Sequence, residues 1–371
     1  MSDKRTVLVT GATGFLGSYI LKRLLDEKDI SLLVLARSKR EEAAEERIKK
    51  TLKYFFGENK YKNIIGRIRI VEGEVDKDFL GLDDKTRRSL TKEIDEIYHL
   101  AAIAAFKVPL DVIRRSNVKG TENVLEFAMG CKNKGKLSRV NHISTTYVAG
   151  IAAGMFYENQ LDVGQGFNNT YEQSKFEAEL VVHNYIKKGL DVTIFRPSVL
   201  TGDSISGKTS NFKMLYQPLH FFAAELFDAV PVERATQENL IPVDSAAEAI
   251  YCVANEKDSK NKTCHICSTA PIELGHFIDV ASNYFGFKKP ELIPLKYFDM
   301  KRLTPTQKNL IEPYIPYFNY NTFFDSANAN RILSQKGFRY PVMNDEFLIK
   351  LFRFCAESGF IRPKRHYVAA G

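Results

Sequence analysis

Short apolar runs alternate with longer amphipathic segments through the first two thirds of the chain. Several runs are apolar without alternation, which is typical of parallel strands that helices cover on both faces. The runs predict strands at residues 6–10, 31–36, 68–72, 96–100, 139–144, 192–196 and 263–267. The segments between them predict helices at residues 16–26, 41–56, 117–131 and 172–188. Strands that alternate with helices in this way indicate an α/β fold, a Rossmann-type doubly wound parallel sheet.

The pattern changes after about Gly202, where aromatic residues become more frequent and prolines interrupt the chain. We interpret this part as a smaller C-terminal substrate-binding cap. Residues 241–255 have the pattern of a strand end and a helix that return to the sheet, so both domains are predicted to be discontinuous. The sheet domain would comprise residues 1–205 and 236–270, and the cap residues 206–235 and 271–371. Within the cap, residues 212–230 predict a buried or pocket-lining helix, because charged residues make this apolar stretch costly to place in a bilayer.

Composition limits the location and the class of ligand. The 371 residues carry a formal charge of +8, which permits an acidic ligand or partner but gives no further support for nucleic acid. Apart from the basic run at 362–366, the charges are dispersed. Five cysteines are an odd number and argue against a disulfide framework. With no secretory-type segment before the first strand, we expect a cytoplasmic protein without a transmembrane segment.

A glycine-rich turn joins the first strand to the first helix. Residues 6–17 read TVLVTGATGFLG. Gly11 would allow a tight turn, Gly14 a close approach of the backbone to a pyrophosphate, and Gly17 the packing of the helix on the strand. The phosphates would lie at the helix N-terminus, where free N–H groups and the helix dipole converge. The alternative is a turn with structural duties alone.

The end of the second strand indicates which dinucleotide would bind. Where an NAD site places an acidic residue for the ribose hydroxyls, this chain has Ala36, Arg37 and Ser38. Arg37 can pair with a 2′-phosphate through its planar guanidinium, and Lys39 and Arg40 add positive charge. NADP(H) is therefore favoured over NAD(H), unless Arg37 merely solvates a loop.

Candidate groups for proton transfer occur at a later strand end and at the start of the following helix. Tyr171 and Lys175 are four residues apart, so they share one helical face. A nearby cation favours the phenolate and would lower the pKa of the tyrosine. Ser144, Thr145 and Thr146 follow the strand at 139–144, at the sheet edge where ligands bind in open α/β folds. A hydroxyl there can donate to a substrate oxygen as negative charge develops.

Together these motifs resemble those of the extended short-chain dehydrogenases/reductases. The resemblance covers about residues 6–270 and rests on the glycine loop, His99-Leu100-Ala101-Ala102, Asn117 with Lys119-Gly120-Thr121, the Ser144-Thr145 strand end, Tyr171 with Lys175, and Phe195-Arg196-Pro197-Ser198. The chain is similar in particular to the branch of thioester reductases and fatty-acyl-CoA reductases. That narrower similarity lies in strand 33–37 with the long helix that contains Arg47, loop 196–202, and Ile241-Pro242-Val243-Asp244.

The resemblance implies roles for individual residues. Tyr171 would protonate the carbonyl oxygen, Lys175 would bind the nicotinamide ribose and lower the pKa of the tyrosine, and Thr145 would hydrogen-bond the substrate oxygen, with Ser144 as the competing choice. Asn117 would help to position the lysine. The rest of the cofactor site would comprise Gly11, Thr13, Gly14, Phe15, Leu16, Gly17 and Arg37, with Glu74 and Val75 beside the adenine and Ala101, Pro197, Ser198 and Val199 along the nicotinamide.

The implied reaction is NADPH-dependent reduction of an acyl thioester, from CoA or an acyl carrier protein, either to an aldehyde or further to the alcohol. An apolar slot for the acyl chain would be lined by Phe212, Leu215, Phe221, Phe222 and Leu226. An acidic carrier would suit the basic chain, and we expect any carrier to come from another chain. The alternatives are an NADP-dependent carbonyl reductase or alcohol dehydrogenase, a nucleotide-sugar epimerase of the same superfamily, and a dinucleotide sensor without activity.

Two further motifs are interpreted as coincidental. Residues 202–209 satisfy the phosphate-loop pattern GxxxxGK[ST], but five residues separate them from the preceding strand. Cys264 and Cys267 form a CxxC without a second pair, and residues three apart on a strand face opposite ways. We therefore expect neither a triphosphate site nor a metal site.

Overall fold

Seven parallel strands form the central sheet. The computed structural model describes residues 4–39 and 41–364, and its sheet strands are β1 (Arg5–Thr10), β2 (Ile30–Ala36), β3 (Ile68–Glu72), β4 (Glu96–His99), β5 (Arg139–Ile143), β7 (Val192–Pro197) and β12 (Thr263–Ile266). Their order is β12-β7-β5-β4-β1-β2-β3, and every pairing is parallel. The predicted Rossmann-type fold is confirmed, and each predicted strand end lies within about one residue of the observed end.

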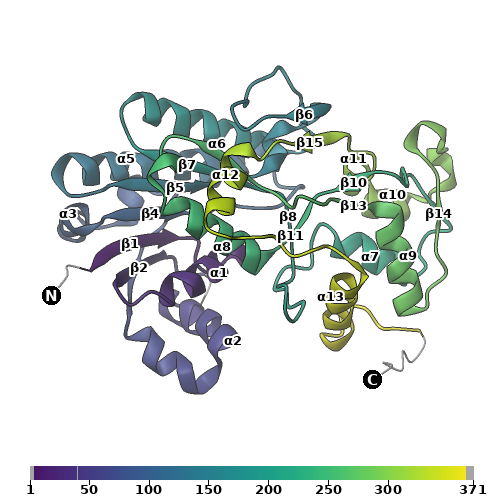
Figure 1. Cartoon of the computed structure of the whole chain (residues 1–371), viewed down its shortest axis with the longest axis horizontal. Coiled ribbons are helices and arrows are strands. Elements are labelled where there is room, and N and C mark those ends of the chain that lie inside the picture. Colours follow the sequence, from purple (N-terminus) through teal and green to yellow (C-terminus); the bar gives the residue numbers. More distant parts are fainter. Residues whose placement is uncertain (1–3, 40, 365–371) are drawn as a thin grey trace.

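Helices cover both faces of this sheet, as the uninterrupted apolar strands require (Figure 1). Side chains such as Val7 and Val9 pack against one set of helices: α1 (Phe15–Leu25), α2 (Ala44–Ile65), α8 (Val243–Ala254) and α12 (Ala327–Gln335). Leu8, which points the other way, packs against the second set: α3 (Asp84–Glu93), α5 (Gly120–Lys134) and α6 (Thr170–Lys187). The strand order reverses between β4 and β1, which places a ligand crevice at their carboxyl ends.

Three of the predicted helices differ from those observed. The backbone of Gly57 is non-helical within α2, so the first helical part ends near residue 56 as predicted and a second part follows it. The helix predicted from residue 117 begins earlier, with α4 (Leu110–Arg114) and a π-helical turn at Arg115–Lys119. The helix predicted over 212–230 is wrong in length, because α7 spans only Tyr216–Ala223 and Glu225 then adopts φ 53°.

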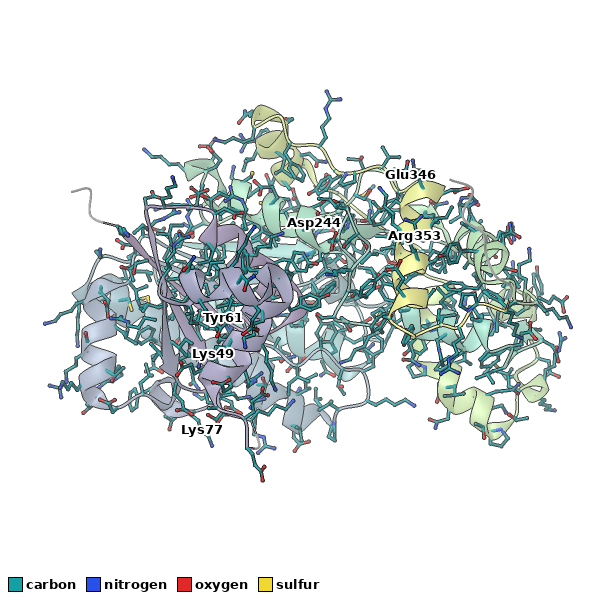
Figure 2. All side chains as sticks on the ribbon, turned by 90° about the horizontal axis from the view of Figure 1, so that it is seen from below. Lys49, Tyr61, Lys77, Asp244, Glu346 and Arg353 are labelled. Atoms are coloured by element: carbon teal, nitrogen blue, oxygen red, sulfur yellow. The ribbon has the colours of Figure 1, made fainter. Side chains whose placement is uncertain are left out.

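The cap forms a second apolar cluster beside the sheet domain, on the right in Figure 1. Its helices are α7, α9 (Leu274–Phe285), α10 (Pro305–Ile311), α11 (Ile315–Phe318) and α13 (Asp345–Glu357). The view from below shows α13, with Glu346 and Arg353, between the sheet domain and the rest of the cap (Figure 2).

Four two-stranded pairs connect the parts of the chain. They are β8 (Val199–Thr201) with β11 (Leu240–Pro242), β10 (Gln237–Glu238) with β13 (Ile272–Glu273), β9 (Ala229–Val230) with β14 (Glu291–Leu292), and β6 (Gly154–Phe156) with β15 (Thr322–Phe324). One segment that the sequence assigned to the cap lies elsewhere: α12 packs on α8 and β12 in the sheet domain. The amphipathic pattern of α12 shows that it buries one face, but not which domain that face contacts. Apart from this segment, the domain limits remain a prediction.

No helix within the described ranges combines the length and the low polarity that a bilayer crossing needs. All five cysteines are free thiols.

Candidate active site

The glycine loop between β1 and α1 brings the backbone into contact with the end of β4. Gly11 has φ 74°, and a Cβ atom there would lie 2.6 Å from the backbone nitrogen of Ala101. A Cβ atom on Gly17 would lie 2.1 Å from the carbonyl oxygen of Gly11. Both positions therefore exclude a side chain, as the sequence predicted. Gly14 is exposed, and its amide donates to the Gly11 carbonyl at 2.9 Å.

The N-terminus of α1 has the features of an anion site. Gly14 occupies the N-cap position, no side chain caps the helix, and its first turn carries no acidic residue. Phe15 and Leu16 are its first residues, so their N–H groups belong to the unpaired first turn. The lack of a Cβ atom at Gly11 and Gly14 leaves the backbone open to a pyrophosphate. These features fit a dinucleotide.

One residue near this loop was not among the predicted site residues. Arg47 of α2 donates to the hydroxyl of Thr13 at 3.0 Å and to the carbonyl oxygen of Arg37 at 2.7 Å. The sequence placed Arg47 on a helix typical of the thioester-reductase branch, but the contact depends on how α2 folds back over β2. Arg47 therefore adds a second guanidinium beside the predicted adenosine end.

Arg37 and Glu74 form an ion pair at 2.6 Å where β2 and β3 end. The Arg37 side chain is half exposed, so its guanidinium is accessible to a phosphate group. Val75 follows Glu74, and its carbonyl accepts from Asn123 of α5. Lys39 lies in the exposed turn that pairs with Glu42. Arg40 and the last two residues of the basic run at 362–366, Arg365 and His366, lie outside the described residues.

The proton-transfer residues meet at the carboxyl end of β5. Asn169 caps α6 by accepting from the backbone of Glu172 at 3.1 Å, which places Tyr171 in the first helical turn. The Tyr171 hydroxyl shares a hydrogen bond with the hydroxyl of Thr145, the second residue after β5. One turn further along α6, the buried Lys175 donates to the carbonyl oxygen of Ile143 at 2.8 Å.

Ser144 and Thr145, the two hydroxyls left open by the sequence, have different partners. Ser144 donates to the carboxylate of Glu179 at 2.7 Å. Thr145 faces Tyr171 and accepts from the backbone of Tyr147 at 3.3 Å. The geometry favours Thr145 as the hydroxyl that can reach a substrate oxygen beside Tyr171.

Burial sets the protonation of this cluster. Desolvation raises the pKa of Tyr171 to about 12, which the hydrogen bond with Thr145 partly offsets. Desolvation also lowers the pKa of Lys175 to about 8, against the opposing effect of Glu179. The expected lowering of the tyrosine pKa by Lys175 is absent in this structure, where the ammonium donates to Ile143 instead. The phenol is thus neutral at physiological pH, which is the form that can donate a proton.

A polar network beneath the cluster ties β1, β4 and α5 together. His99 contacts the hydroxyls of Thr10 at 2.8 Å and Thr121 at 3.1 Å, and Ala101 donates its N–H to Thr10 at 3.3 Å. Burial, followed by the charge of Lys175, lowers the pKa of His99 to about 3, so the ring is neutral.

Asn117 extends this network to α6 without contacting the lysine itself. Its side chain donates to Ser174 at 2.9 Å and exchanges two hydrogen bonds with the backbone of Ile103. Asn117 therefore holds the residue adjacent to Lys175, within the π-helical turn described above.

A fully buried ion pair anchors α6 to the sheet. Arg196 of β7 donates through Nε to both carboxylate oxygens of Glu179, at 3.0 and 3.1 Å, and also contacts His265 at 3.1 Å. Burial opposes the ionisation of Glu179, but the charge of Arg196 and hydrogen bonds from its partners lower the pKa of the carboxyl well below its ordinary value. Cys264 and Cys267 on either side of His265 are buried thiols.

The predicted nicotinamide-side residues follow β7. Pro197 ends the strand, Ser198 donates to the side chain of Asn239 at 2.8 Å, and Val199 begins β8. Val199 also lines an apolar pocket between the sheet and the cap, together with Leu215, Leu219, Phe222, Phe277 and Phe318 among others. Of the predicted slot residues, Leu215 and Phe222 line this pocket. Phe212 instead stacks on Phe360, Phe221 is buried in the cap core, and Leu226 is 41% exposed.

The phosphate-loop pattern does not form a nucleotide site. The amides of Ile205 and Ser206 donate to the carboxylate of Asp203, and no helix follows directly because α7 begins at Tyr216. Gly202 and Gly207 pack against each other, and Gly207 against α13. Across residues 4–39 and 41–364, no group of three or more His, Cys, Asp or Glu side chains is arranged to hold a metal ion.

Comparisons with known proteins show what the chain as a whole is similar to. A family model described as "Male sterility protein" matches residues 9–250. The chain is 27% identical over 322 residues to nonribosomal peptide synthetase asaC of Aspergillus flavus, covering 84% of this chain and 31% of that protein. It is 23% identical to the alcohol-forming fatty acyl-CoA reductase of Simmondsia chinensis, covering 89% of this chain and 90% of that protein.

A solved structure also resembles the whole chain. The terminal R domain from the myxalamid PKS-NRPS biosynthetic pathway superposes with a TM-score of 0.84 and 26% identity, covering 98% of this chain and 94% of that domain. The chain spans less than a third of the length of the first curated relatives, between 7% and 31%.

Substitution Gly17→Ala tests the crossing of α1 over the glycine loop. We expect a loss of about 1–3 kcal/mol in the free energy of unfolding, because the methyl group must displace the Gly11 carbonyl. Gly66→Ala is the matched control, since a Cβ atom there meets nothing within 4 Å. Denaturant unfolding measures both, and equal stability of the two variants would contradict the close approach.

Substitution Arg196→Met tests the buried ion pair. Leaving Glu179 unpaired should cost about 3–5 kcal/mol at neutral pH. The lowered pKa of Glu179 contributes stability above the ordinary carboxyl pKa, and this contribution is lost as the pH falls. The difference in the free energy of unfolding between the parent and Arg196→Met should therefore become smaller as the pH is lowered.

Arg114→Ala serves as control, because it breaks an exposed ion pair of the same helix, with Glu177. It should change the melting temperature little at any pH. If the difference in melting temperature between the parent and Arg196→Met did not depend on pH, the role of the charge pair would be contradicted.

Proposed function

Because the chain belongs to the male sterility protein family of extended short-chain dehydrogenases/reductases, which are NAD(P)-dependent oxidoreductases, we propose that it reduces an acyl thioester with NADPH. The observation that carries the proposal is the cluster of Thr145, Tyr171 and Lys175 at the sheet edge beside an apolar pocket. The product is an aldehyde and a thiol, and a second reduction would give the alcohol.

Thr145 and Tyr171 act on the carbonyl oxygen of the substrate in this reaction. NADPH, when bound, supplies the hydride that adds to the carbonyl carbon. Thr145 and Tyr171 donate hydrogen bonds to the carbonyl oxygen, and Tyr171 gives it a proton as negative charge develops. The neutral phenol, kept so by burial, suits this role. Collapse of the resulting hemithioacetal expels the thiol without a covalent bond to the protein.

Each part of NADPH would be held by a different group of residues at the sheet edge. The α1 N-terminus would hold the pyrophosphate through Gly11, Thr13, Gly14, Phe15, Leu16 and Gly17. Arg37 would bind the 2′-phosphate with Arg47 close by, and Glu74 and Val75 would border the adenine. Lys175 would bind the nicotinamide ribose with help from Asn117, while Ala101, Pro197, Ser198 and Val199 would border the ring. Support for NADPH over NADH comes from Arg37, because no acidic residue occupies the end of β2.

The relatives support a thioester as substrate. Similar proteins include a fatty acyl-CoA reductase and peptide synthetases, and another similar structure is that of a thiolation-reductase di-domain from an archaeal non-ribosomal peptide synthetase. We propose that the acyl group reaches this chain as a thioester of CoA or of an acidic carrier protein. NADPH oxidation with acyl-CoA, acyl-carrier thioester, free aldehyde and UDP-sugar in parallel tests this. NADPH oxidation with aldehyde alone would make the chain a carbonyl reductase. Conversion of UDP-sugar to its epimer without net NADPH oxidation, followed by chromatography, would make it an epimerase-like enzyme.

Substitution Tyr171→Phe should lower kcat about 10²- to 10⁴-fold, because the proton donor is lost. NADPH binding, followed by its fluorescence, should be retained. Thr145→Val should also lower kcat. Ser144→Ala should lower the melting temperature and change kcat little, because Ser144 bonds to Glu179. If Ser144→Ala lost kcat and Thr145→Val did not, the assignment of the hydroxyl would be reversed.

Substitution Arg37→Ala should raise KM for NADPH about 10- to 100-fold, because a charge-assisted hydrogen bond to the 2′-phosphate is lost. KM for NADH should stay nearly constant. Arg69→Ala on the adjacent strand β3 is the control, since it breaks a comparable pair with Glu93 away from the site. Equal effects of Arg37→Ala on both coenzymes would refute the preference for NADPH.

A further inference from the structure

The apolar pocket opens beside the catalytic cluster. Phe106 lies between Tyr171 and Tyr317, with ring centroids 6.4 and 5.4 Å away respectively. Tyr317 lines the pocket and donates to the carboxylate of Glu172, the residue after Tyr171. Val199 also lines the pocket and belongs to the segment assigned to the nicotinamide ring. An acyl chain whose carbonyl lies at Tyr171 can therefore extend into this pocket.

Among the described residues that line the pocket, Glu238 alone has a charged side chain. It is only 8% exposed, and the other lining side chains are aliphatic or aromatic. The Tyr147 hydroxyl and the backbone N–H of Asn239 are the polar groups nearest to it, and the Tyr147 hydroxyl makes no hydrogen bond within the described residues. No lysine, arginine or histidine among the described residues forms an ion pair with it.

The backbone holds Glu238 firmly relative to the reacting end. Glu238 belongs to β10, where it is opposite Ile272 of β13. The next residue, Asn239, accepts from the Ser198 hydroxyl and from the Ser268 backbone through its side chain, and from the Val199 backbone through its carbonyl. The carboxyl is thus fixed to the same segment that borders the predicted nicotinamide site.

A carboxyl in such a place is costly to the folded chain. Burial raises the pKa of Glu238 to about 8, because the carboxylate lacks a compensating positive charge. A carbon chain bearing an ammonium group would supply both things the pocket lacks: apolar contact along the walls and a counterion at Glu238. A wholly aliphatic chain would leave the carboxyl desolvated and unpaired.

We propose that Glu238 is a specificity-determining residue that binds a protonated amine on the acyl chain of the substrate. This assignment rests on the proposed function and narrows its substrate class to aminoacyl thioesters. The walls formed by Leu219, Phe222 and Phe277 contact the methylene groups between the thioester and the amine.

The test compares matched pairs of aliphatic acyl thioesters, in which one member carries a primary amine where the other carries a methyl group. In the pair with the most suitable chain length, the parent should have a kcat/KM about tenfold or more higher for the amine than for its methyl partner, as expected for one charge-assisted hydrogen bond. Glu238→Gln should abolish this preference by raising KM for the amine, so that kcat/KM becomes similar for the two members of a pair. Glu273→Gln is the matched control, because it removes the same charge from the paired strand at an exposed position.

The preference should also depend on pH. The titratable groups that interact with Glu238 are the hydroxyls of Tyr147 and Tyr320, and Glu172 acts on the same two tyrosines. Because the carboxylate form increases as pH rises through about 8, the preference for the amine should grow from pH 7 to pH 9 in the parent and stay flat in Glu238→Gln. A preference that Glu238→Gln retains, or that Glu273→Gln also loses, would overturn the proposal.

A binding measurement separates this proposal from the proposed function. A linear alkylamine should raise the melting temperature of the parent but not that of Glu238→Gln, whether or not any thioester is reduced. If no thioester is turned over and the alkylamine still stabilises the parent alone, the amine site stands and the reductase function fails. If the alkylamine stabilises neither protein, the amine site is refuted.

Discussion

The buried pairing of Glu179 with Arg196 decides where α6, the helix that carries the candidate proton donor, can lie. Tyr171, Lys175 and Glu179 are spaced by four residues and face the same side of α6. That face can pack against the carboxyl edge of β5 and β7 only if the Glu179 carboxylate is paired with a counterion, because an isolated buried charge strongly destabilises the fold. Arg196 provides the counterion from β7, and the resulting fit leaves Lys175 against the Ile143 carbonyl and Tyr171 against Thr145.

The same helix connects the sheet domain to the cap. Its first turn carries Glu172, whose buried carboxylate accepts from Tyr317 of α11. Asn169, which caps the helix, also donates to Tyr317. The first turn of α6, which carries the candidate proton donor Tyr171, is therefore hydrogen-bonded to the cap on both sides of that residue. The pocket opens at this junction, which explains how an acyl chain and the proton donor could be held in register.

Burial has opposite effects on two groups that the proposed chemistry needs. It raises the pKa of the phenol and lowers that of the ammonium group, so each is held nearer to its neutral form. For a reduction this is favourable at Tyr171, because the group must give up a proton rather than accept one. The effect could not be judged from the spacing of Tyr171 and Lys175, which suggested that the ammonium group would act on the phenol directly.

The sequence by itself determined the sheet, the glycine loop and the identity of the candidate proton donors. These are local properties: apolar runs that must be covered on both faces, glycines where no Cβ atom fits, and a tyrosine and lysine four apart on a helix. Tertiary structure alone decided that Ser144 bonds to Glu179 while Thr145 faces Tyr171, that Arg47 reaches Thr13, that α12 returns to the sheet, and that Glu238 enters the pocket. Each of these depends on contacts between segments distant along the chain. The pattern of a segment shows that it must be buried, but its partner is chosen by the packing of the whole molecule.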